Sequence, residues 1–203
     1  MIEETKWSID QSHSRIAFKI KHLMISYVTG RFERFNADIY TTTKDFTTAE
    51  IDLWIDAASI NTGDEKRDQH LRSKDFLDVP NHDQIIFRAN QIGKPDKNGN
   101  RRLRGDLTIK NIIKNVELNV QFGGIAKDPW GNEKAGFTVS GKINRNDWGL
   151  NWNSNIETGG FILGEEIIIS CDIELIKEVN KEQAMEMEAS VNKKDISTDR
   201  IKK

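Results

Sequence analysis

The chain has 203 residues, of which 36% are hydrophobic and 31% charged, and its formal net charge at pH 7 is −2. This length suits one medium-sized domain, and the composition is that of a globular protein rather than a membrane protein. A net charge so close to zero supplies neither the basic field of a nucleic-acid-binding protein nor an acidic excess for a cationic partner.

Alternation of apolar and polar residues with a period of two dominates the chain and predicts β-strands with one buried face. The alternating runs, in order, are 6–10, 16–22, 35–39, 49–56, 85–89, 103–109, 116–122, 137–143 and 167–175. Phe32 lies out of phase with the run that follows it, which predicts a bulge at a bent corner. Turn-forming residues at 93–100 and 127–132 predict hairpin loops.

One segment departs from this pattern. Thr62 and Glu65 have the Thr-x-x-Glu spacing of a capping box, in which each side chain satisfies a free backbone donor at a helix start. The polar residues 66–74 that follow are compatible with a helix, so we predict a short helix across one end of the sheet structure. These elements define one domain, residues 5–176.

The composition changes after this domain. Residues 177–203 are rich in Glu, Lys, Asn and Ser and form a charged C-terminal tail. Such a segment buries too little apolar area to offset its ordering entropy, so we predict that it is disordered or weakly helical. Eight or nine strands with one short helix fit a closed barrel or a sandwich, and periodicity does not decide whether a barrel is filled or hollow.

The sequence shows no motif for catalysis or metal binding. The four histidines, at positions 13, 22, 70 and 82, form neither a His-x-x-x-His nor a His-Glu-x-x-His arrangement. A Gly-x-Ser-x-Gly elbow and a phosphate-binding loop are also missing. The single Cys171 excludes an internal disulfide and a cysteine-only zinc site. We therefore expect no catalytic residue, no metal site and no cofactor.

Hydropathy predicts the location of the protein. No stretch approaches the ~18 consecutive apolar residues of a membrane span. Residues 1–6 lack the apolar core of a signal peptide. We therefore expect a cytoplasmic protein without an integral membrane segment, or an exported one if a leader precedes these residues.

An ordered set of motifs resembles the YceI-like family. The most specific is residues 67–77, Arg-Asp-Gln-His-Leu-Arg-Ser-Lys-Asp-Phe-Leu, which resembles the family block Arg-Asp-x-His-Leu-Arg-Ser-x-Asp-Phe. Further matching blocks are residues 7–10, 13–14, 22–23, 30–32, 59–62, 105–109, 128–131 and 135–137, so the resemblance covers roughly residues 6–176. Asn111 stands where the family has Gly, and Asn is the residue other than Gly that best tolerates a left-handed turn. Asp83 replaces a family Pro.

This resemblance implies an all-β fold, an eight-stranded antiparallel lipocalin-like β-barrel with one short helix across one end. It also implies a non-catalytic carrier that holds a long-chain isoprenoid or other lipid in the barrel, and dimerisation, for which the sequence supplies no interface. Nucleic acid is not an expected partner. Two alternatives stay open: a stress-response structural barrel without a physiological ligand, and an enzyme acting on a quinone-like or lipid-like substrate through His22 or His70.

Parity along the strands, combined with the resemblance, predicts the residues that line a lipid pocket. Burying hydrocarbon contributes roughly 0.8 kcal/mol per CH₂, so such a pocket needs an apolar wall more than polar recognition. The predicted lining residues are Phe18, Ile20, His22, Phe32, Phe35, Leu53, Leu71, Phe76, Phe87, Leu107, Phe122, Phe137, Val139, Trp148, Phe161, Leu163 and Ile169.

Each of these features also has a plainer structural interpretation. His22 lies either at a ligand's head group or at the edge of the core, bonded to backbone. Arg67 either binds a phosphate head group or, with Asp68, pins the helix to the barrel. The glycine-flanked loop 159–164 is either a movable pocket rim or a flexible connection, and the aromatic rings either line a lumen or fill it.

Overall fold

A computed structural model describes residues 4–154 and 162–178. Its strands are β1 (Thr5–Ile9), β2 (Arg15–His22), β3 (Ser26–Phe32), β4 (Phe35–Thr41), β5 (Glu50–Asp56), β6 (Ile60–Asn61), β7 (Gln84–Ile92), β8 (Asn100–Ile109), β9 (Ile112–Lys127), β10 (Glu133–Asn144) and β11 (Leu163–Lys177). The helices are α1 (Glu65–Arg72) and the 3-10 turns η1 (Ala57–Ser59) and η2 (Arg145–Trp148). The predicted tail lies outside the described residues from position 179 onward.

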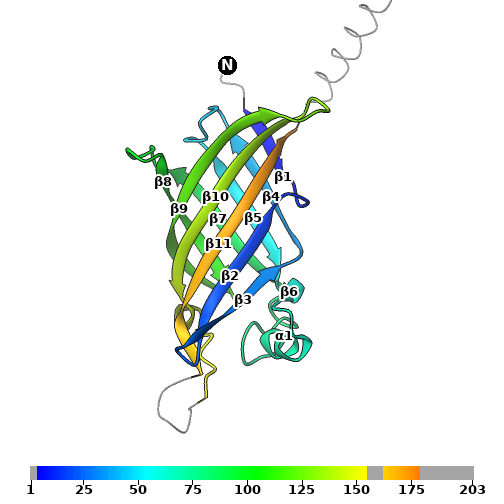
Figure 1. Cartoon of the computed structure of the whole chain (residues 1–203), viewed down its shortest axis with the longest axis vertical. Coiled ribbons are helices and arrows are strands. Elements are labelled where there is room, and N and C mark those ends of the chain that lie inside the picture. Colours follow the sequence, from blue (N-terminus) through cyan, green and yellow to red (C-terminus); the bar gives the residue numbers. More distant parts are fainter. Residues whose placement is uncertain (1–3, 155–161, 179–203) are drawn as a thin grey trace, which may run out of the picture.

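Eight strands close into an antiparallel barrel, as predicted (Figure 1). The order is β1-β4-β5-β7-β8-β9-β10-β11, and β1 pairs back with β11. β11 pairs with β1 at its C-terminal end and with β2 over its N-terminal part. β1 and β2 therefore lie end to end along the same edge of β11. β3 pairs with β2 and continues in the same way into β4. This closure excludes the sandwich.

The corner between β3 and β4 differs from the prediction. There is no bulge at Phe32: β3 ends there, and β4 begins at Phe35 with different neighbours. The two residues between them are held by Ser59, whose carbonyl accepts from the Glu33 amide at 3.1 Å and whose hydroxyl accepts from the Arg34 amide at 3.0 Å. The out-of-phase residue therefore marks a change of pairing partner.

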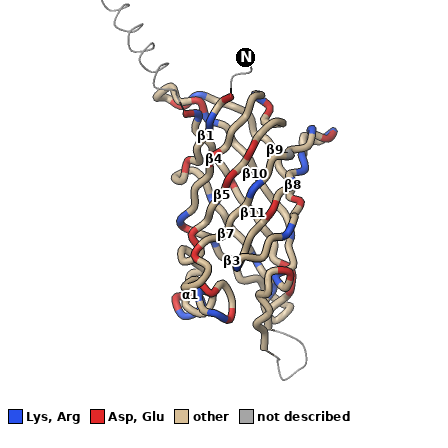
Figure 2. The backbone as a smooth tube through the Cα atoms, turned by 180° about the vertical axis from the view of Figure 1, so that it is seen from behind, with Lys and Arg blue, Asp and Glu red and all other residues tan. Residues whose placement is uncertain are grey.

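Strand parity places most apolar side chains inside the barrel and most charged ones outside, although Arg101 of β8 is buried. In β8, buried and exposed residues alternate, with Leu103 and Leu107 inward and Arg102 and Arg104 outward. Figure 2 shows that residues of both signs are spread over the wall of the barrel. Pairs such as Arg104 Nε with Glu117 Oε2, 2.8 Å apart, are exposed and contribute little stability.

α1 begins differently from the prediction. Its N-cap is Asp64, whose carboxylate accepts from the Arg67 amide at 3.0 Å, so the predicted capping box at Thr62 is wrong. The Thr62 hydroxyl instead donates to the Asp68 carboxylate at 2.5 Å. This carboxylate is buried and therefore requires a hydrogen-bond donor from the protein. Among the described residues, no helix is both long and apolar enough to cross a membrane.

The hairpin loops occur where turn-forming residues predict them. Residues 93–99 join β7 to β8, and residues 128–132 join β9 to β10. Between β8 and β9 the chain turns on Lys110 and Asn111, which have φ angles of 51° and 61°. Asn111 thus adopts the left-handed geometry expected of it.

Candidate functional site

The barrel encloses a cavity of about 630 Å³, within the range of small-molecule sites. Inward-facing residues of its strands form the wall. At one end the wall includes Asp64 and Lys66 of the α1 region, which are exposed to solvent. The cavity therefore reaches the surface beside α1, and we call this opening the mouth.

The cavity stays hollow because aromatic rings lie over glycines of neighbouring strands. Phe18 is paired with Gly30, and a Cβ built on Gly30 would lie 2.5 Å from the Phe18 ring. A Cβ built on Gly105 would lie 2.6 Å from the Phe87 ring. Each ring occupies the space that a side chain would otherwise take on the wall, so it lies along the wall and leaves the centre open.

Phe46 closes the end of the cavity away from α1. It comes from the loop between β4 and β5, has φ 60° and is only 1% exposed. Its ring centroid lies 5.1 Å from that of Trp7, 5.6 Å from Phe122 and 4.9 Å from Phe137. These aromatic contacts make this end a packed floor.

Aromatic and polar side chains together form the mouth. The ring centroids of His70, Phe76 and Trp152 lie 4.7–5.3 Å apart in pairs. His70 Nε2 is 3.0 Å from Asp75 Oδ2, which orients the imidazole. His22 lies at the last position of β2 and faces the cavity opposite Leu163.

Arg67 and Asp68 pin α1 to the barrel. Arg67 Nε donates to the Thr62 hydroxyl at 2.7 Å, and its Nη2 donates to the Thr62 carbonyl at 2.9 Å. The Thr62 amide donates to Asp68 at 2.9 Å. Arg72 adds a bond from its Nε to the Ala58 carbonyl at 3.0 Å. This geometry supports the structural interpretation of the motif, although Arg67 also lines the cavity.

Arg145 holds the other side of the mouth. It is buried and donates to the backbone carbonyls of Leu150, Trp152 and Gly164. Burial lowers the pKa of this guanidinium. Among the described residues no carboxylate lies within ion-pair distance of it, so its hydrogen bonds to backbone fix the segment that carries Trp152.

Most of the predicted lining residues form the cavity wall. These are Phe18, Ile20, His22, Phe32, Leu53, Leu71, Phe76, Phe87, Leu107, Phe137, Val139, Leu163 and Ile169. Three others lie outside the wall. Phe35 is buried in the core, Phe122 packs against Phe46 in the floor, and Trp148 is buried with its indole nitrogen donating to the Leu107 carbonyl at 3.1 Å. The last predicted residue, Phe161, lies outside the described residues.

One aromatic residue of the site, Phe46, escaped sequence reasoning about the lining. It lies in a polar loop with no strand period, and its one signal is that it is a lone apolar residue among threonines and charges. The sequence places two tryptophans, Trp148 and Trp152, around residues 149–151, where each could be a rim aromatic, a packing residue or part of an oligomer contact. Trp152 lines the cavity at the mouth, whereas Trp148 is packed in the core.

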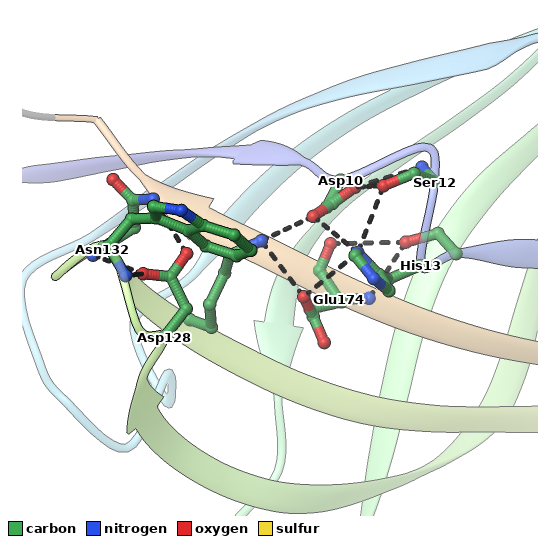
Figure 3. Close-up of polar contacts among 9 residues, drawn as sticks. Asp10, Ser12, His13, Asp128, Asn132 and Glu174 are labelled. Carbon is green, nitrogen blue, oxygen red and sulfur yellow. Dashed lines mark hydrogen bonds and ion pairs between the residues drawn. The ribbon is translucent and has the colours of Figure 1, made fainter.

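A polar cluster lies outside the cavity, where the turn after β1 meets β10 and β11 (Figure 3). Ligand atoms of Asp10, His13 and Glu174 lie within 4.8 Å of one another, a spacing that a metal ion could use. However, Lys134 Nζ lies 2.5 Å from Asp10 Oδ2 and 3.1 Å from Glu174 Oε1. With the ammonium bound to both carboxylates, the group is an ion-pair cluster that joins three strands.

The cavity wall is chemically inert over most of its area. Its thiol, Cys171, is buried, and this burial raises its pKa to about 11, far from the thiolate form that reacts. The polar side chains on the wall, including Thr62, Lys66 and His70, gather at the mouth. The arrangement suits a long apolar molecule with a polar end near α1.

Comparisons with known proteins agree with this architecture. A family model described as the YceI-like domain matches residues 7–175. A protein designated UPF0312 from Staphylococcus epidermidis is 40% identical over 164 residues, covering 80% of this chain and 92% of the relative. The YceI protein of Campylobacter jejuni, a solved structure, is 30% identical with a TM-score of 0.65, covering 79% of this chain and 91% of that one.

A more distant solved structure extends the likeness in fold. It is described as a polyisoprenoid binding domain from Saccharophagus degradans implicated in plant cell wall breakdown. It covers 85% of this chain and 98% of its own, with a TM-score of 0.61 and 16% identity. At this identity the comparison shows a shared barrel.

Proposed function

The chain belongs to the YceI-like family, and from this premise we propose that its barrel binds a long-chain isoprenoid or similar lipid and carries it without changing it chemically. The observation that carries the proposal is the hollow apolar cavity, open at the α1 end and closed by Phe46 at the other. A hydrocarbon chain transferred into it leaves water, which contributes roughly 0.8 kcal/mol per CH₂.

The polarity of the wall orients the ligand. The chain of the lipid lies among the aliphatic and aromatic residues toward Phe46, and its head group lies at the mouth near His22, Lys66 and His70. Because Phe46 packs the far end of the cavity, the barrel is a container that releases its ligand through the mouth by which it entered. The distant neighbour described as a polyisoprenoid binding domain supports the isoprenoid class.

The chemistry of the wall supports a carrier over an enzyme. Neither serine nor tyrosine lines the cavity among the described residues, and the Cys171 thiol is held protonated. His70 packs edge-on against Phe76 and Trp152 and is bonded to Asp75, which suits an orienting or gating role. Dimerisation and a cytoplasmic location stay predictions.

The test is to fill the lumen without disturbing the outside. Val139 faces the cavity on β10, and its neighbour Ser140 faces outward. We expect native mass spectrometry of the full chain, mixed with farnesol or a longer prenyl alcohol, to show a one-to-one complex for the wild type and for Ser140→Trp. Val139→Trp is expected to lose the complex while keeping its circular dichroism spectrum.

Two results would count against the carrier. Wild-type protein from its host that carries no ligand and takes up no prenyl lipid favours the structural barrel without a physiological ligand. Conversion of a bound quinone-like or lipid-like compound, abolished by His22→Ala or His70→Ala in a folded protein, favours the enzyme.

A further inference from the structure

Exposed apolar residues gather on two hairpins. Among the described residues, the exposed large hydrophobic side chains other than Trp130 are Leu23, Met24, Ile25, Tyr27, Ile112 and Ile113. The first four belong to the hairpin between β2 and β3 and the last two to the hairpin between β8 and β9. Ile25 is 85% exposed and Ile113 63%, so these side chains contribute little to the core.

Both hairpins lie at the mouth. His22, which lines the cavity, is followed directly by Leu23, whose amide donates to the Ile162 carbonyl at 2.7 Å. β9 starts at the end of the barrel where its neighbour β10 runs into η2, and Ile112 packs close to Gly149 there. Figure 1 shows the β2–β3 hairpin, η2 and α1 at the same end of the molecule.

Within the two hairpins themselves, the charged residues are all lysines. Residues 16–30 and 107–116 include Lys19, Lys21, Lys110 and Lys114 and contain no acidic residue. Acidic residues at this end lie on other elements: Glu65 and Glu166 pair with Arg72 and Lys142. Asp64 before α1, Asp147 in η2 and Glu165 in β11 are also exposed there. Such hairpins suit the surface of an anionic membrane. The apolar tips can insert at the boundary with the acyl chains, and the flanking lysines can contact the anionic head groups.

The backbone of the β2–β3 turn holds its apolar residues outward. Leu23 and Met24 have φ angles of 50° and 59°, a region that disfavours side chains with a Cβ and that Asn or Gly would adopt more easily. A strained turn built from bulky apolar residues in solvent suits a surface that is covered during function.

We propose that this end of the barrel docks on a membrane with anionic head groups, with the tips of both hairpins inserted in the interface. The mouth then faces the bilayer, and a lipid passes between membrane and cavity without crossing water. The proposal rests on the proposed function. A second copy of the chain fits this surface less well than a membrane does. Two copies that met through these hairpins would place their lysines against one another, and like charges repel.

The test measures binding of the full chain to phosphatidylcholine vesicles with and without phosphatidylglycerol. Wild-type protein is expected to bind the anionic vesicles, with binding weakened by salt. Ile25→Glu combined with Ile113→Glu should weaken binding by about tenfold or more, since each change removes an apolar contact and adds repulsion. Trp130→Glu is the matched control: Trp130 is 84% exposed but lies in the β9–β10 loop at the opposite end, so binding should be unchanged.

A second measurement separates this proposal from the carrier function. The double variant is expected to take up farnesol from vesicle-free solution as well as wild type does, by native mass spectrometry. Vesicle binding without farnesol uptake would remove the carrier and leave the docking surface. The docking proposal is overturned if wild type ignores anionic vesicles, if Trp130→Glu weakens binding equally, or if the double variant only abolishes self-association.

Discussion

The ring of Phe18 covers Gly30 on the neighbouring strand so closely that a Cβ at Gly30 would lie 2.5 Å from the ring's Cζ atom and 2.9 Å from its Cε1 atom. It would also lie 2.9 Å from Cγ2 of Thr62, the residue that anchors α1 through Arg67 and Asp68. The absence of a side chain at Gly30 therefore leaves room both for the Phe18 ring against the wall and for Thr62, which anchors α1 at the mouth.

Gly30→Ala is expected to push the Phe18 ring toward the lumen. Overpacking of this kind costs about 1–3 kcal/mol, and the displaced ring should also weaken lipid uptake. Gly136→Ala is the control, because a Cβ there would meet no atom within 4 Å. Urea denaturation and native mass spectrometry measure the two effects. Equal stability and equal lipid uptake in both variants would mean that the position of the Phe18 ring does not depend on the absence of a side chain at residue 30.

Phe46→Ala is expected to open the floor of the barrel. The side chain is buried against Trp7, Phe122 and Phe137, so its removal should cost about 3–5 kcal/mol of unfolding free energy. Phe46→Leu keeps most of the packing and should fold while releasing bound lipid faster. Stopped-flow dissociation of a fluorescent prenyl probe measures this rate, and an unchanged rate in Phe46→Leu would show that the floor does not control exchange.

Much of the wall could be predicted from sequence because strand parity is a local property. Alternation alone places Ile20, Phe87, Val139 and Ile169 inward, and all four line the cavity. Whether the rings fill the lumen depends on which residue lies opposite each ring. That is set by the register of two strands, such as the pairing of Phe18 with Gly30, which no local pattern contains.

The ends of the barrel were harder to predict, because loops have no period. Phe46 and Trp152 take their roles from tertiary contacts. Asp64 rather than Thr62 is the N-cap of α1, because the Thr62 hydroxyl is bonded to the buried Asp68 carboxylate. The cluster of Asp10, His13, Lys134 and Glu174 joins residues more than 100 positions apart along the chain, as in the Lys134–Asp10 separation of 124 positions.

Cys171 is expected to react slowly with thiol reagents in the folded protein. Its pKa is raised to about 11 by burial, so the thiolate fraction at pH 8 is small and access is restricted. A disulfide reagent should modify it at least about tenfold more slowly than in denaturant. The matched control is Ser170→Cys in a Cys171→Ser background, since position 170 faces outward. Equal rates for the two thiols would contradict the inward position of Cys171.

Stability should fall in acid because of Asp10. Burial alone would raise the pKa of this carboxyl, but hydrogen bonds from Lys134, Ser12 and His13 outweigh it and hold the pKa well below its ordinary value of 3.8. A folded-state pKa below the unfolded one contributes stability that is present above about pH 4 and is lost as the pH falls toward the folded value. Asp10→Asn should therefore cost about 2 kcal/mol at pH 7 and flatten the acid limb, so that the two stability curves converge below pH 4.

The control for this effect is Asp52→Asn, which removes an exposed ion pair with Arg88 and should change the unfolding free energy by less than about 1 kcal/mol at any pH. Urea denaturation between pH 3 and pH 7 measures all three proteins. Curves for wild type and Asp10→Asn that run parallel over this range would show that the carboxyl of Asp10 is not held ionised by Lys134. The same result would mean that the cluster joining β1, β10 and β11 contributes through packing instead of charge, because only an ionised carboxylate links its stability to pH.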